Sequence, residues 1–175
     1  MSNRHLHVPL GTANFLSVLE GIEGGFAIFV GIVAGLYFQA VNHDILVATG
    51  LISVIVSAFN SSAVRYASEH YLDELDGREK RNKLRAYFFP ALTEFITYIL
   101  VSIVAVLPLL LIQDSPTAIS LTTLITVVIL FGAGWYRGHL LGRHSLRDGL
   151  EMAGLGVAII IIGASSGVFL AGLVG

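Results

Sequence analysis

Residues 14–38, NFLSVLEGIEGGFAIFVGIVAGLYF, decide the fold of this chain. A helix needs about 20 consecutive apolar residues to cross the hydrocarbon of a bilayer, and this run is long enough. Two acids, Glu20 and Glu23, interrupt it. A carboxylate at membrane depth is costly, so it generally faces a bundle interior or a water-filled cavity and serves an ion or proton path. The run therefore predicts a membrane-spanning helix that carries functional acids.

Four more apolar runs follow, at about residues 45–67, 87–112, 117–136 and 146–174. The chain is 55% hydrophobic and 13% charged, with a mean hydropathy of +0.81, which leaves too little polar surface for a soluble globule. We predict an all-α, multi-pass integral membrane bundle of five helices over residues 14–175. Residues 1–13 are too polar for a signal peptide and are expected to form a cytoplasmic segment.

The basic residues indicate the orientation of the helices. Cytoplasmic loops carry an excess of Lys and Arg, and in this topology all ten fall on one side. They are Arg4, Arg65, Arg78, Lys80, Arg81, Lys83, Arg85, Arg137, Arg143 and Arg147. We therefore predict a cytoplasmic N-terminus, an outside C-terminus and a cytoplasmic connection at about residues 69–86.

The buried acids are predicted to share one depth in the cytoplasmic half. Glu94 and Glu151 lie one or two turns into their helices and join Glu20 and Glu23, while Asn60 and Ser61 add oxygen atoms from the second helix. Hard and borderline divalent cations bind oxygen ligands, so this group is a candidate metal site whose protonation would release the ion. The alternative is that one acid forms a structural ion pair with Arg65 and the others reach the interface.

A second candidate set lies in the polar stretch after the second apolar run. Glu69 and Asp73, and His70 and Glu74, are spaced i,i+4 on a helix that projects from the membrane. They could collect metal ions. The alternative is a solvated helix end beside a positive membrane anchor.

Other patterns exclude functions. The chain has no Cys, which excludes disulfides and thiolate metal sites. It has no Ser/His/Asp arrangement, phosphate loop or HExxH motif, so we expect neither an enzyme nor a bound cofactor. A net charge of −2 suggests no nucleic-acid partner. The spacing of Gly21 with Gly25, and of Gly31 with Gly35, allows close helix packing within the bundle or across a dimer.

The order of these motifs resembles the vacuolar iron transporter family. The motifs that carry the resemblance are Glu20–Ile22 with Phe26 and Ala27, Phe59–Ala63 before Tyr66, Leu107–Leu110, and Arg147–Met152. The resemblance implies a five-helix, N-inside homodimer that transports ferrous iron or manganese.

Several positions depart from the family pattern. Where the family has an Asp and a Met in the second helix, this chain has Ser57 and Ser61, and Arg65 stands where an acid or amide is expected. Only Glu20 is carried over as a pathway ligand, with Glu in place of Asp, and Glu23 could replace the lost acid of the second helix. The large cytoplasmic metal-collecting helices are reduced to residues 69–79.

We therefore expect a transporter that moves a divalent cation, Fe²⁺ or Mn²⁺, out of the cytoplasm in exchange for protons. The expected host is the plasma membrane of a prokaryote, or a vacuolar-type membrane in a eukaryote. Two alternatives stay open. One is a non-transporting family member that serves as a membrane scaffold or partner subunit, and the other is a transporter or channel for another small ion.

Overall fold

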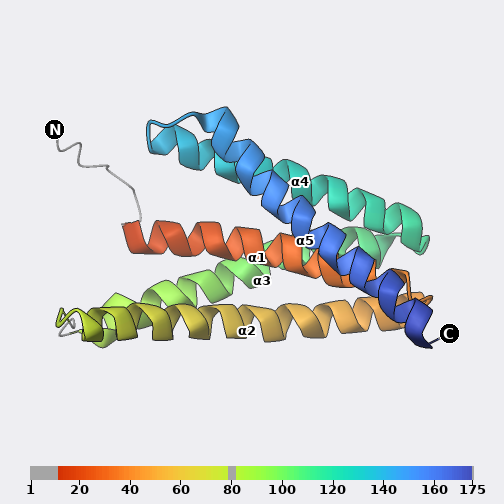
Figure 1. Cartoon of the computed structure of the whole chain (residues 1–175), viewed down its shortest axis with the longest axis horizontal. Helices are drawn as coiled ribbons and strands as arrows, with labels where there is room; N and C mark the ends of the chain where they lie inside the picture. Colours follow the sequence, from red (N-terminus) through yellow and green to blue (C-terminus); the bar gives the residue numbers. More distant parts are fainter. Residues whose placement is uncertain (1–11, 79–81, 175) are drawn as a thin grey trace.

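The computed structural model describes residues 12–78 and 82–174 as a bundle of long helices (Figure 1). The helices are α1 (Thr12–Tyr37), α2 (His43–Leu75), α3 (Phe89–Leu111), α4 (Ser115–Leu140) and α5 (Ser145–Val174). A π-helical segment, η1 (Leu84–Phe88), leads into α3. All five long helices have the length and composition of membrane spans. This confirms the predicted all-helical, multi-pass integral membrane protein. The predicted segment 1–13 lies, apart from its last two residues, outside the described part of the chain.

The largest difference from the predicted helices is the length of α2. It continues to Leu75, whereas the apolar run ends at Ala67. Polar residues can extend a helix beyond the membrane because water satisfies their side chains, and the i,i+4 pair of Arg65 with Glu69 supports this extension. The helix therefore projects from the apolar layer, as the spacing of its acids predicted.

Local signals at the connections explain where the helices begin and end. The side chain of Asn42 accepts a hydrogen bond from the Ile45 amide at the start of α2, and Asp114 accepts one from the Thr117 amide at the start of α4. The hydrogen bonds from Thr117 lower the pKa of the Asp114 carboxyl, so this cap stays ionised to lower pH than an ordinary Asp. Gly142 follows α4 with a φ of 63°, a conformation that glycine adopts without strain.

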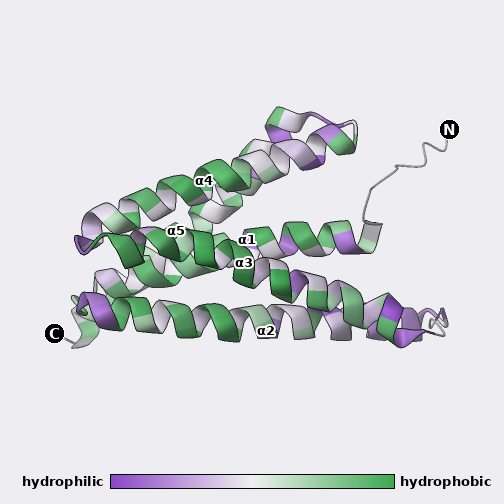
Figure 2. Cartoon of the chain, turned by 180° about the vertical axis from the view of Figure 1, so that it is seen from behind, coloured by the Kyte–Doolittle hydropathy of each residue, from purple (hydrophilic) through white to green (hydrophobic). Residues whose placement is uncertain are grey.

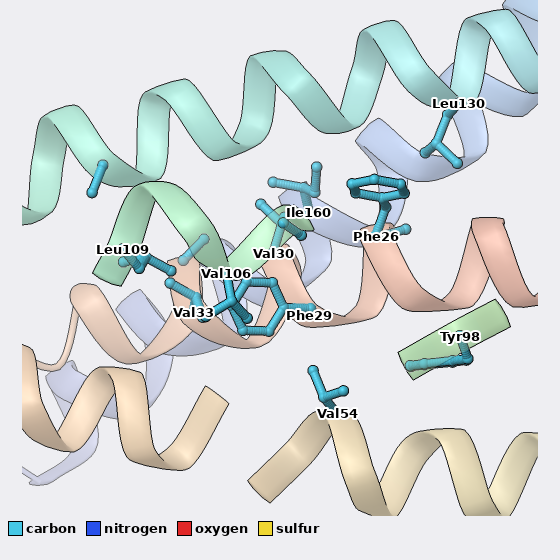
Figure 3. Packing of buried hydrophobic residues seen from close by; sticks show 14 of the residues in the cluster. Phe26, Phe29, Val30, Val33, Val54, Tyr98, Val106, Leu109, Leu130 and Ile160 are labelled. Atoms are coloured by element: carbon cyan, nitrogen blue, oxygen red, sulfur yellow. The ribbon is translucent and has the colours of Figure 1, made fainter. Parts of the chain in front are cut away.

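Helix α1 is the centre of the bundle, since it packs against all four other long helices. Its buried face carries Phe26, Phe29, Val30 and Val33. Figure 3 shows these side chains meeting residues from the surrounding helices. The partners labelled there are Val54, Tyr98, Val106, Leu109, Leu130 and Ile160. The acids of α1 are therefore held on the most enclosed helix of the protein.

The glycines of α1 allow its neighbours to approach within the same chain. A Cβ atom on Gly21 would lie 2.9 Å from the Glu94 carbonyl of α3, and one on Gly35 would lie 2.7 Å from the Gly163 carbonyl of α5. Gly25 and Gly31 likewise face α3 and α5. This confirms that the spacing serves packing within the bundle; packing across a dimer stays a prediction.

The two ends of the bundle differ in charge. The start of α1, the α2–α3 connection and the α4–α5 turn lie at one end (Figure 1), which we call the basic end. Every described Lys and Arg belongs to these segments or to the adjoining helix turns, except Arg65, which lies about three turns before the end of α2. Figure 2 shows hydrophobic residues along the middle of the helices and hydrophilic ones gathered at their ends. This distribution agrees with the predicted orientation, in which the basic end faces the cytoplasm; the orientation itself stays a prediction.

Single-cysteine labelling tests this orientation, because the native chain has no Cys. We expect Asp76→Cys, at the basic end, to react with a membrane-impermeant maleimide only from the cytoplasmic side. Gln113→Cys, in the α3–α4 connection, should react only from the opposite side. Both positions are exposed, so labelling of both from one side would contradict a five-span arrangement.

Candidate functional site

Arg65 of α2 lies at the centre of a charge cluster near the basic end. Its side chain is only 8% exposed. The guanidinium forms ion pairs with Glu20 of α1 and, through Nη2 at 2.8 Å, with Glu69 one turn along α2. Its Nε lies 3.9 Å from Oε2 of Glu94 on α3. Three helices therefore direct one carboxylate each toward a single buried cation.

Glu94 is the most deeply buried of these acids, with 1% of its surface exposed. Ser61 of α2 donates a hydrogen bond to Oε1 of Glu94. The other oxygen, Oε2, has no hydrogen-bond partner and is fully covered. A buried polar atom without a partner is expensive, and a carboxylate more so. The arrangement around Glu94 is therefore not optimised for stability.

A cavity of about 390 Å³ adjoins these side chains. We call Glu20, Ser61, Arg65, Glu69 and Glu94 the Arg65 cluster; all five line this cavity. Leu16, Val64 and Ser68 complete the lining. Glu20 and Glu69 are 51% and 33% exposed, whereas Glu94 is enclosed. The cluster therefore offers carboxylate oxygens from an accessible rim to a buried end.

Glu23 belongs to a different environment. It is half-buried on α1 and interacts electrostatically with Arg137 of α4. The Nε of Arg137 also lies 3.9 Å from Oδ2 of Asp148 on α5, which is 3% exposed. Glu20 and Glu23, which were predicted to belong to one site, thus face different arginines. Asp148 was not among the predicted residues. Its position just after the short α4–α5 turn, opposite Arg137, could have indicated an ion pair between the two helices.

Asn60 and Glu151 do not join the Arg65 cluster. Asn60 is exposed on α2, and Glu151 is exposed on α5, where its neighbour Met152 is buried instead. A helix turns by about 100° per residue, so the next residue along the chain faces the interior in each case. The shared depth of the acids did not determine which of them face the bundle interior.

The second predicted metal set engages largely in other contacts. Glu69 pairs with Arg65. Asp73 accepts a hydrogen bond of 2.9 Å from the Tyr87 hydroxyl, and the His70 ring stacks on Tyr66 and meets Tyr87 edge to face. Glu74 is exposed. These contacts attach the projecting end of α2 to η1 and favour the structural alternative for this stretch.

Among residues 12–78 and 82–174, no three acidic or histidine side chains are arranged to hold a metal ion. In the Arg65 cluster, the guanidinium occupies the space between the carboxylates. The cluster nevertheless has three carboxylates against one cation. Its net negative charge and its cavity are suited to attract a further cation.

Comparison with known proteins identifies the class of protein that this bundle represents. The sequence profile of the VIT family matches residues 68–168, more than half of the chain. The chain belongs to this family, which confirms the predicted resemblance. The family is one of transporters, and membership implies membrane metal transport. The match includes Glu69, Glu94 and Glu151, whereas Glu20 and Arg65 precede it. No curated protein matches the chain in a sequence comparison.

Proposed function

We propose that this protein moves a divalent cation, Fe²⁺ or Mn²⁺, out of the cytoplasm in exchange for protons. The observation that carries the proposal is the Arg65 cluster, where Glu20 and Glu94 line a cavity beside the basic end of the bundle. Carboxylates supply both the oxygen ligands and the negative charge that a dehydrated divalent ion requires. Ser61, in place of a soft methionine, favours a hard ion such as Mn²⁺.

Proton exchange follows from the same side chains. A buried carboxylate is stable either when it is protonated or when a cation neutralises it. Protons and a metal ion would therefore compete for the carboxylates of the cluster. Alternation between these two states couples the ion to protons.

A homodimer remains part of the proposal, on the basis of the family resemblance. Its interface is not assigned to the α1 glycines, because these contact α3 and α5 of their own chain. The cluster itself is formed within one chain. All five residues of the Arg65 cluster therefore come from one copy of the chain.

A non-transporting scaffold is the second candidate function, and the position of Arg65 favours it. A guanidinium that neutralises the carboxylates permanently would make the cluster a structural ion network. In that case Glu20→Gln would lower the melting temperature, and Arg65→Leu would partly restore it in the double variant. If the cluster transports metal, the double variant regains no transport.

Glutamine variants of two acids at similar depth test the site. We expect Glu20→Gln to lower Mn²⁺ flux in proteoliposomes by about tenfold or more, because it removes a charged ligand next to the cavity. Glu151→Gln has the same chemistry on the outer face of α5 and should keep wild-type flux. Equal flux of both variants and the wild type would exclude Glu20 from the site, and loss of flux in Glu151→Gln alone would place the site elsewhere.

A further inference from the structure

The guanidinium of Arg65 is held by every acid of its cluster. Besides its ion pairs with Glu20, Glu69 and Glu94, its Nη2 lies 3.3 Å from the carbonyl oxygen of Ala13 in the first turn of α1. An arginine is always charged. The position that a bound cation would take between these carboxylates is thus filled by a side chain of the protein.

The contact between Arg65 and Glu94 is poorly satisfied. Neither the Arg65 Nε nor the Glu94 Oε2 forms a hydrogen bond, although both atoms are fully buried. They lie 3.9 Å apart, whereas a charge-assisted hydrogen bond is about 2.8 Å long. A small cation would approach carboxylate oxygens to about 2.0–2.6 Å. Glu94 therefore has an unused oxygen that a compact ion in the adjoining cavity could bind.

Charge prevents the guanidinium and a divalent ion from sharing these acids. Two cations a few ångströms apart at low dielectric repel each other strongly. The three negative charges of the cluster balance Arg65 and a divalent ion in total, but both cations would need the same position between Glu20 and Glu94. Binding of one cation therefore weakens binding of the other.

Glu69 could remain the ion-pair partner of the guanidinium if Arg65 moved away from Glu20 and Glu94. It lies one turn beyond Arg65 on the same helix and is 33% exposed, while the side chain of Glu94 is 2% exposed. The hydrogen bond of 2.8 Å between Arg65 Nη2 and Glu69 is the best-formed contact that the cluster gives this side chain. A rotation of Arg65 that kept Glu69 as its partner would move the guanidinium toward the rim and free Glu20 and Glu94.

We propose that Arg65 is a tethered counter-cation that competes with a hard divalent ion for Glu20 and Glu94, and that the ion binds when the guanidinium withdraws toward Glu69. This inference rests on the proposed function of the cluster. Arg65 thereby sets the affinity of the site. It offsets part of the charge of the carboxylates between ions and weakens metal binding enough for release.

The test is Mn²⁺ binding to the purified full chain, measured from the electron paramagnetic resonance signal of free Mn²⁺. We expect Arg65→Gln to bind Mn²⁺ about tenfold tighter or more, because a repelling charge at contact distance is removed. Arg85→Gln removes a positive charge from η1 outside the cluster and should keep wild-type affinity. Arg65→Gln combined with Glu94→Gln should lose the gain. Unchanged or weaker binding by folded Arg65→Gln would overturn the proposal.

Arginine modification in the wild-type protein provides a readout that does not depend on folding of the variant. Phenylglyoxal modification of Arg65, measured by mass spectrometry, should become several-fold faster when Mn²⁺ is added, because the guanidinium moves toward solvent. Arg85 serves as the internal reference and should not change. An Arg65 that is equally protected with and without Mn²⁺ would contradict displacement.

The two proposals fail in different ways. The wild type could transport Mn²⁺ while Arg65→Gln left the Mn²⁺ affinity unchanged and metal did not alter the modification of Arg65. This combination would overturn only the role of Arg65. Absence of both Mn²⁺ flux in the wild type and Mn²⁺ binding in Arg65→Gln would overturn the proposed function as well.

Discussion

Replacing Glu94 with glutamine is expected to reduce Mn²⁺ flux in proteoliposomes by about 100-fold or more, since even groups that only support metal ligands contribute 10–100-fold. Glu94 is the enclosed end of the cavity, and its Oε2 is a buried oxygen of the Arg65 cluster without a hydrogen bond. Glutamine keeps the shape and can still accept the hydrogen bond from Ser61. Because a neutral amide is cheaper to bury than a carboxylate, the variant should fold and keep its melting temperature.

Asp148→Asn is the matched control for this loss. Asp148 is also a buried acid whose carboxylate oxygen lies 3.9 Å from the Nε of an arginine, Arg137, and it too lacks a hydrogen bond on that oxygen. It differs in facing the α4–α5 side of the bundle. We expect Asp148→Asn to retain most of the wild-type flux. If both variants lost flux equally, transport would depend on buried charge in general and not on the Arg65 cluster.

The second large effect concerns stability at the crossing of α1 and α5. Gly163→Leu is expected to disrupt this packing, because a Cβ atom at Gly163 would overlap the Gly31 carbonyl and lie 2.8 Å from the Gly31 Cα. Both atoms belong to backbone, so neither can rotate away. Forcing extra methylene groups into a packed core costs about 1–3 kcal/mol, and more where the backbone must move. The melting temperature in detergent should fall sharply.

Gly154→Leu controls for the change of residue type on the same helix. A Cβ atom at Gly154 would meet nothing within 4 Å, and leucine has a higher helix propensity than glycine. This variant should be as stable as the wild type or slightly more stable. A Gly163→Leu protein that melts at the wild-type temperature would show that α1 and α5 do not approach as closely as described.

The sequence was sufficient to predict the number of helices and their approximate positions. Runs such as residues 14–38 and 146–174 have one explanation in physical terms, because only helices satisfy the backbone over such apolar lengths. The extension of α2 to Leu75 was less certain from composition, since a polar helix and a polar loop are both stable in water. The one-sided distribution of Lys and Arg predicted that one end of the bundle is basic. The arrangement of the helix ends agrees with this prediction.

The site could be predicted only in part, because depth along a helix is easier to infer than direction around it. Glu20 and Glu94 were placed at one level, and the structure brings both to Arg65. Glu23 lies at the same level but faces Arg137, and Glu151 faces outward. Which helix each face meets depends on packing between distant segments, such as the glycine contacts of α1 with α3 and α5. A single sequence does not specify these pairings.

Proteoliposomes that contain the full chain and an internal pH-sensitive dye test proton-coupled metal transport most directly. When Mn²⁺ is added outside vesicles with an acidic lumen, we expect Mn²⁺ uptake together with a rise of the internal pH. Uptake should be faster with the proton gradient than without it, and vesicles with Glu94→Gln should show neither change. Absence of Mn²⁺ uptake by the folded wild-type protein, with or without the gradient, would contradict metal transport, and uptake without any proton movement would contradict the exchange.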